Sequence, residues 1–243
     1  MVSETALLAA LAFIGALVVG VTGFGSALVT IPLATHFVPL QFALPLFALV
    51  DCSTAFSVGL ENPRNAARDE WRRLVPMILL GSALGVTLLV NLPRALGMGL
   101  LGAFVLAYAL YTLVRHGPAR VIHPGWAWLA GLCGGITSTL FGAGGPPYAM
   151  YLSQRGLSKE QFRATMGFAI MTSISVRIVA FLITGLLLDR AVWLTALVAV
   201  PAALLGLWIA RHLYLRISRE ALMRVVALIL LASGGSLLLR ALY

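Results

Sequence analysis

Six apolar stretches in this sequence are each long enough to cross a lipid bilayer as a helix, which takes about 20 residues. They are residues 40–60, 73–90, 95–114, 164–187, 191–210 and 221–239. Backbone polar groups inside a bilayer must be satisfied within the segment, so separate apolar stretches of this length cross it as α-helices. The sequence therefore predicts an all-α integral membrane protein, and a charged fraction of only 10% agrees with that class.

Two further regions, residues 5–35 and 126–152, are equally apolar but are interrupted by glycine-rich segments. The interruptions span Gly20–Ser26 and Gly134–Pro147. The stretch that follows each of them is too short to cross a bilayer. We therefore expect each region to form a broken helical hairpin, which returns to the side of the membrane from which it entered.

The two interrupted regions also resemble each other in sequence. Gly20-Val-Thr22 is similar to Gly135-Ile-Thr137, and Phe24-Gly25 is repeated as Phe141-Gly142. The similarity predicts a duplicated chain in which each repeat is one hairpin followed by three helices. The first repeat is residues 1–115, with hairpin 5–35 and helices 40–60, 73–90 and 95–114; the second is residues 116–243, with hairpin 126–152 and helices 164–187, 191–210 and 221–239.

The positions of the basic residues predict the orientation in the membrane. If both interrupted regions are hairpins, the connectors 61–73, 115–123, 153–163 and 211–224 lie on one side and carry 13 Lys and Arg, against three on the other side. If each region crossed once, the same residues would divide eight against eight. Cytoplasmic loops collect Lys and Arg, so these connectors are predicted to be cytoplasmic and both termini periplasmic. The two repeats are then inverted, which is common among secondary transporters.

The hairpin tips are the predicted binding site. Each tip would begin a half-helix near the bilayer midplane, with its free N–H groups and positive dipole end directed at the centre, where an anion is stabilised. Glycines allow close approach of the backbone, and hydroxyl groups add uncharged donors. Close helix packing by small residues is the alternative interpretation. The candidate substrate-binding residues are Thr22, Gly23, Phe24, Gly25, Ser26, Thr137, Ser138, Thr139, Gly142, Gly144 and Gly145.

Asp51 and Arg177 are ionisable residues near the middle of predicted helices 40–60 and 164–187. Charges at this depth usually face a cavity, a partner or a substrate. The planar guanidinium of Arg177 suits a carboxylate, sulfite or sulfonate, and Asp51 is a candidate proton-coupling site or counter-charge. A structural ion pair is the alternative. Arg163, at a predicted helix start, is interpreted as a topological anchor in preference to a contact on the substrate's path.

The remaining residues form no pattern typical of an enzyme, a metal centre or a nucleic-acid-binding surface. The sequence contains no nucleotide-binding loop and no nucleophile with a matching base, so we expect no catalytic residues and no cofactor. The net charge of +9 is accounted for by the basic connectors, so we expect no nucleic-acid partner. The histidines lack the spacing of metal ligands; they are His36, His116, His123 and His212.

Three motifs resemble the TauE/SafE family of membrane permeases: Gly20–Ser26, Gly135–Pro147 and Gln161-Phe-Arg-Ala-Thr165. The resemblance implies a multi-pass protein of the bacterial inner membrane that transports small sulfur-containing anions, such as sulfite or sulfoacetate. We expect a secondary transporter with alternating access around a midplane site, with an anion channel or a structural membrane subunit as alternatives. The expected partners are a small anion and the lipid bilayer, while proton or ion coupling and a homo-oligomer are left open.

Overall fold

The computed structural model describes residues 2–114, 121–213, 227–228, 230–232 and 234–239. Within these ranges the chain is helical and contains no strand. Five of the described helices are long and apolar enough to cross a membrane. The prediction of an all-α integral membrane protein is therefore confirmed.

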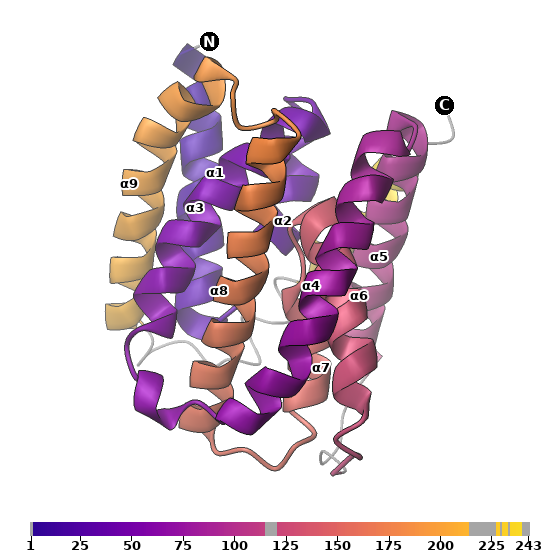
Figure 1. The fold of residues 1–243 in the computed structure, drawn as a ribbon. Coiled ribbons are helices and arrows are strands. Elements are labelled where there is room, and N and C mark those ends of the chain that lie inside the picture. The colour runs from indigo at the N-terminus through magenta and orange to yellow at the C-terminus, as the bar shows by residue number, and fades with distance from the viewer. Residues whose placement is uncertain (1, 115–120, 214–226, 229, 233, 240–243) are drawn as a thin grey trace.

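The first hairpin consists of α1 (Val2–Thr22) and α2 (Ser26–Ala34), and α2 runs back toward the end at which α1 begins (Figure 1). The reversal occurs at Gly23 and Gly25, with φ of 85° and 97°. Glycine adopts this left-handed region readily because it has no Cβ. The Thr22 hydroxyl stabilises the turn by donating to the carbonyl oxygen of Val18 at 2.7 Å and accepting from the N–H of Phe24 at 3.2 Å.

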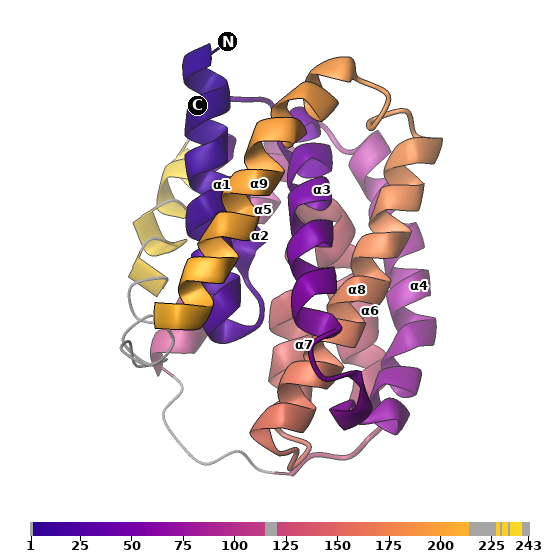
Figure 2. The same ribbon diagram turned by 90° about the vertical axis from the view of Figure 1, so that its left-hand side faces the viewer.

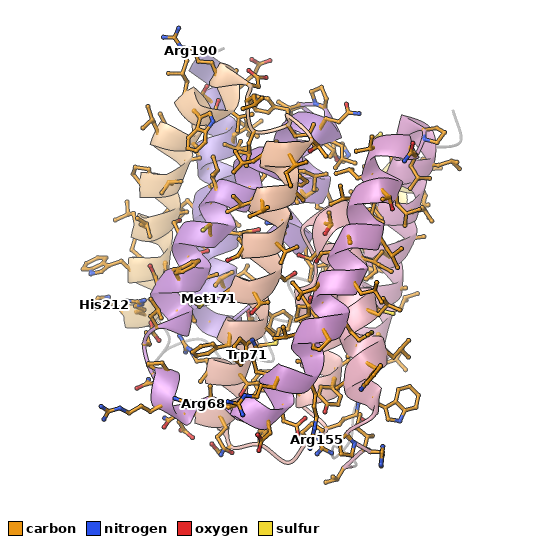
Figure 3. The ribbon with its side chains drawn as sticks, in the orientation of Figure 1. Arg68, Trp71, Arg155, Met171, Arg190 and His212 are labelled. Atoms are coloured by element: carbon orange, nitrogen blue, oxygen red, sulfur yellow. The ribbon has the colours of Figure 1, made fainter. Side chains whose placement is uncertain are left out.

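The second hairpin consists of α6 (Trp126–Phe141) and α7 (Gly145–Leu152), with Gly142 at φ 69° in the break. It opens at the opposite end of the molecule from the first hairpin (Figures 1 and 2). Arg68 and Arg155 lie at the end where α6 begins, whereas Arg190 lies at the end where α1 begins (Figure 3). The charge count predicts this separation of basic residues, and which end is cytoplasmic stays a prediction.

The other helices differ from their predicted bounds mainly at their ends. They are α3 (Leu40–Gly59), the short 3-10 helix η1 (Pro63–Asn65), α4 (Arg68–Asn91), α5 (Arg94–Val114), α8 (Lys159–Ile183) and α9 (Arg190–Leu213). A capping box starts α8 five residues before its predicted start at 164, with Ser158 accepting from the N–H of Gln161. The same helix ends at Ile183 and not at 187, because Gly185 takes φ 79°.

Helices pack mainly across the two predicted repeats. α1 packs against α9, α6 packs against α4, and α3 packs against α8 in the middle (Figure 2). Glycines permit close approach, since a Cβ atom on Gly85 would lie 3.0 Å from the carbonyl oxygen of Ile136. The predicted helix 221–239 is described only in part, with helical residues at 227–228, 230–232 and 234–239. Parts of the connectors 115–123 and 211–224 also lie outside the described residues.

Candidate functional site

The tips of the two hairpins contact each other. A Cβ atom on Gly145, at the start of α7, would lie 2.9 Å from Cδ2 of Phe24. A Cβ atom on Gly142 would lie 2.5 Å from Cδ1 of Ile31 in α2. Both positions therefore need glycine so that the two tips can approach, and the phenyl ring of Phe24 is only 5% exposed as a result.

A cavity of about 50 Å³ lies between the tips and the helices α3 and α8. By volume this is room for about three or four water molecules. Nine of the sequence-predicted site residues line it: Gly23, Phe24, Gly25, Ser26, Ser138, Gly142, Gly144, Gly145 and Asp51. The tertiary structure thus brings both tips to one place.

Arg177 is fully buried behind the wall of this cavity and does not line it. Its Nη2 donates to Oδ2 of Asp51 at 3.1 Å, and its Nη1 donates to the carbonyl oxygen of Ser138 at 3.1 Å. A Cβ atom on Gly142 would lie 2.8 Å from Nη1, so this glycine also lets the guanidinium approach the second tip. The guanidinium is therefore bonded to two groups that do line the cavity, Asp51 and Ser138, and the Asp51 carboxylate balances its charge.

Three buried polar atoms around the cavity have no hydrogen-bond partner within the described part of the chain. They are Oγ of Ser26, Oδ1 of Asp51 and Nε of Arg177, out of five such atoms in all the described residues. Buried polar atoms without a partner are rare and costly, so a cluster of them calls for an explanation. The Ser26 hydroxyl lies close enough to the Asp51 carboxylate to donate to it, and a bound ligand, water or proton at the cavity would provide the partners that remain missing.

Besides Arg177, three predicted site residues do not line the cavity, and their hydroxyl groups are engaged locally. Thr22 bonds within the first tip, Oγ1 of Thr137 donates to the carbonyl oxygen of Cys133 at 2.8 Å, and Oγ1 of Thr139 donates to that of Gly135 at 3.1 Å. Such bonds to the preceding helical turn are a common alternative for Thr. Pro146 and Pro147 at the start of α7 lack an N–H, which leaves the second tip fewer backbone donors than we expected.

The sequence analysis missed three polar residues that line the cavity: Thr54, Tyr148 and Ser173. The Tyr148 hydroxyl donates to Oγ of Ser173 at 3.3 Å. Helical spacing could have indicated two of them, since Thr54 follows Asp51 by three residues and Ser173 precedes Arg177 by four. No pattern in the sequence points to Tyr148.

Two of the larger hollows lie toward opposite ends of the molecule. One, of about 270 Å³, is at the end of Arg155 and is lined by charged residues of the α3–η1 connection and of α8, and by Val58. The other, of about 310 Å³, is near the opposite end and is lined partly by Leu140 and Phe141. Val58 also lines the central cavity, and Leu140–Phe141 directly precede Gly142. The cavity thus shares a lining residue with the first hollow and is adjacent in sequence to lining residues of the second.

The described residues offer no metal centre. No group of three or more His, Cys, Asp or Glu in this part of the chain could hold a metal ion. The described histidines are engaged near helix ends: Nδ1 of His36 lies 2.9 Å from the carbonyl oxygen of Pro32, and Nδ1 of His212 lies 2.8 Å from that of Trp208.

Comparison with known proteins gives matches over most of the chain. The family model described as Sulfite exporter TauE/SafE matches residues 7–237. The chain is 31% identical over 180 residues to the "Probable inner membrane transporter protein TsaS" of Comamonas testosteroni, covering 71% of this chain and 74% of that protein. It is 26% identical over 229 residues to the "Probable sulfite/organosulfonate exporter TauE" of Cupriavidus necator, covering 91% of this chain and 88% of that protein. No solved structure matches the chain significantly.

Proposed function

Because this chain belongs to the sulfite exporter TauE/SafE family, we propose that it is a secondary transporter for a small sulfur oxyanion or organosulfonate, with sulfite as the best-fitting substrate. The chain is a multi-pass membrane transporter of the bacterial inner membrane. The observation that carries the proposal is the cluster of unpaired polar atoms on Ser26, Asp51 and Arg177 around a cavity between the hairpin tips.

The size of the cavity supports sulfite within this substrate class. A cavity of about 50 Å³ favours the smaller anion, because sulfoacetate has twice as many heavy atoms as sulfite and requires the cavity to widen more. Sulfite presents oxygens that can accept a hydrogen bond from the Ser26 hydroxyl in the cavity wall. The Arg177 guanidinium lies behind that wall, so it binds the anion only after it exchanges its bond to Asp51 for a bond to the substrate. Arg177 is bonded to two residues of the cavity wall, Ser138 and Asp51, and supplies the charge that favours an anion once Asp51 is protonated.

Asp51 neutralises Arg177 while the site is empty. When substrate arrives, a proton on Asp51 removes the carboxylate charge that would otherwise repel the anion, and it frees the guanidinium to bind substrate oxygens. Oδ1 of Asp51 is the atom that receives this proton, because Oδ2 accepts the bond from Arg177. Anion and proton then cross together, and both leave on the opposite side.

Alternating access follows from an inverted arrangement of the two repeats. The pairing of α1 with α9 mirrors that of α6 with α4, and α3 meets α8 between them, as expected for two halves related by a two-fold axis in the membrane plane. The hollows toward the two ends support two access routes. In the transport cycle the central cavity opens to one hollow at a time.

Uptake by the purified chain in liposomes tests this proposal. We expect saturable exchange of radiolabelled sulfite, inhibited by unlabelled sulfite, and no exchange by the Arg177→Ala variant. The Arg190→Ala variant, which removes an exposed arginine at one end, is the matched control and retains exchange. Large single-channel currents would instead identify an anion channel, and a lack of any flux would refute transport by this chain alone.

A further inference from the structure

The backbones of α3 and α8 touch beside the central cavity. A Cβ atom on Gly167 would lie 2.7 Å from Cα of Gly59, so no side chain separates the two helices there. Gly167 itself lines the cavity. Met171, between the same helices in Figure 3, occupies the space that a side chain on Gly59 would need. This contact lies close to the hollow of about 270 Å³, since Val58, next to Gly59, and Arg163, one turn before Gly167, line that hollow.

One turn beyond the crossing, an ion pair joins the same two helical segments. Glu61, just after α3, is bonded by Nη2 of Arg163 in α8 at 3.4 Å and by Nη2 of Arg211 in α9 at 2.6 Å. Charge-assisted bonds of this kind are normally about 2.7–2.9 Å long. Glu61 is therefore held closely by Arg211 and only loosely by Arg163.

Arg163 has donor capacity that the described residues do not use. Its Nε is buried and has no partner among them, and its contact with Glu61 is long. A guanidinium has five N–H donors in a planar fork that matches two oxygens of an oxyanion. The Arg163 side chain also lies beside the first hairpin tip, since its Cγ is 3.8 Å from the position of a Cβ atom on Gly23.

The Arg163 side chain lies between the hollow of about 270 Å³ and the central cavity. It lines the hollow of about 270 Å³ together with Glu61 and Val58. Val58 also lines the central cavity, and so does Gly23, against which Arg163 packs. An anion that moves from the hollow to the cavity past Val58 and Gly23 comes close to this guanidinium.

We propose that Arg163 and Glu61 form the gate at this end, and that an arriving anion takes over the Arg163 guanidinium from Glu61 and lets α3 and α8 separate at Gly59–Gly167. This proposal rests on the function proposed above and names the residues that control access to the same site. Glu61 keeps its 2.6 Å ion pair with Arg211 when Arg163 moves away, so the Glu61 carboxylate is not left without a partner. The partial exposure of both side chains, 32% for Arg163 and 29% for Glu61, allows them to move apart into solvent.

Transport kinetics distinguish a gate from a structural ion pair, because the two partners are predicted to act in opposite directions. In inside-out vesicles, Arg163→Gln should raise the KM for sulfite by about tenfold or more, the effect of losing a hydrogen bond to a charged group. Glu61→Gln should lower the KM, because it removes the competitor of the anion. Arg68→Gln removes the same charge at an exposed position of the same end and should leave KM unchanged. If Arg163→Gln and Glu61→Gln shift the KM for sulfite equally and in the same direction, the proposed gate is refuted.

Thiol labelling tests the gate without relying on transport. With Cys52 and Cys133 replaced by alanine, Ala55→Cys places one thiol at the cavity wall. In inside-out vesicles we compare its labelling by anionic sulfonatoethyl methanethiosulfonate and by the cationic trimethylammonium analogue. The anionic-to-cationic rate ratio should fall with Arg163→Gln, rise with Glu61→Gln and stay unchanged with Arg68→Gln.

The two experiments separate this proposal from the proposed function. A wild-type chain that transports no sulfite but shows the opposite labelling shifts would refute sulfite transport and retain the gate. A chain that transports sulfite but shows no shift in the labelling ratio for either variant would retain the function and refute the gate.

Discussion

The guanidinium of Arg177 in α8 donates to the carboxylate of Asp51 in α3 across 3.1 Å, and so joins the two predicted repeats at the wall of the central cavity. A charged side chain at mid-depth in a membrane is expensive unless it has a partner. Each residue therefore compensates the charge of the other, and replacing one of them by a neutral residue leaves the remaining charge without a partner in an apolar interior.

Arg177 variants should separate substrate binding from folding. Arg177→Lys keeps the charge but loses the two-pronged geometry, and it should weaken sulfite binding about tenfold or more in a thermal-shift titration. Arg177→Ala should abolish binding and destabilise the protein by about 3–5 kcal/mol, because Asp51 is left unpaired. The double variant Arg177→Ala, Asp51→Asn should recover stability without binding. Native affinity in a folded Arg177→Ala protein would make the residue structural.

Asp51→Asn should uncouple transport from the proton gradient. The amide has nearly the shape of the carboxylic acid but cannot take up or release a proton, so a pH gradient that accelerates wild-type sulfite flux should leave the variant unaffected. Asp69→Asn, at an exposed position of α4, is the control and should keep the wild-type response. If the pH-gradient response persists unchanged in Asp51→Asn, the coupling proton is carried elsewhere.

Gly145→Ala should force the hairpin tips apart. Its Cβ atom would lie 2.9 Å from the Phe24 ring, and such overpacking typically costs about 1–3 kcal/mol. We expect reduced sulfite flux, partly restored by adding Phe24→Leu, whereas Gly235→Ala has open space and should behave as wild type. No rescue by Phe24→Leu would contradict a direct contact between the tips. Gly144 is a poor test position, because its Cβ would meet the backbone of α6 at the carbonyl oxygen of Gly134, 2.8 Å away.

Membrane orientation can be measured with single cysteines in a protein without Cys52 and Cys133. Ser153→Cys in the exposed turn after α7 should react with an impermeant thiol reagent only from the cytoplasmic side. Leu188→Cys, 74% exposed in the turn before α9, should react only from the periplasmic side. Labelling of both positions from one side would exclude the hairpin arrangement and, with it, the inverted repeats.

Glu70 anchors the second hairpin and should matter for stability. Its carboxylate accepts bonds from Nε and Nη2 of Arg155 at 3.1 and 3.0 Å, and from the Tyr151 hydroxyl at the end of α7. Tyr151→Phe should lower the free energy of unfolding by about 1–3 kcal/mol, since a bond to a charged group is lost. Arg73→Gln, whose side chain is 44% exposed, should change stability far less in the same thermal unfolding experiment. Equal effects of the two variants would contradict an anchoring role for the buried bond.

The sequence alone determined the membrane class, the two helix breaks and the pair of ionisable residues at mid-depth. These are local properties: hydrophobicity follows from composition, and the positive φ angles at Gly23, Gly25 and Gly142 arise where glycine permits them. Asp51 and Arg177 stand out because a charge in an apolar stretch is visible without any knowledge of packing. The helix ends were harder to predict from the sequence, since the hydrophobic pattern marks the apolar part of α8 and not its cap at Ser158.

Only the tertiary structure decided which atoms face the cavity. A threonine hydroxyl in a helix can bond either to the backbone of its own helix or to a ligand. In this structure Thr22, Thr137 and Thr139 bond to the backbone of their own helices. The partnership of Arg163 with Glu61, 102 residues apart in sequence, likewise depends on how α8 lies against α3. Rotation of a helix about its axis and the distance to its neighbour are set by contacts between remote segments, which no local pattern encodes.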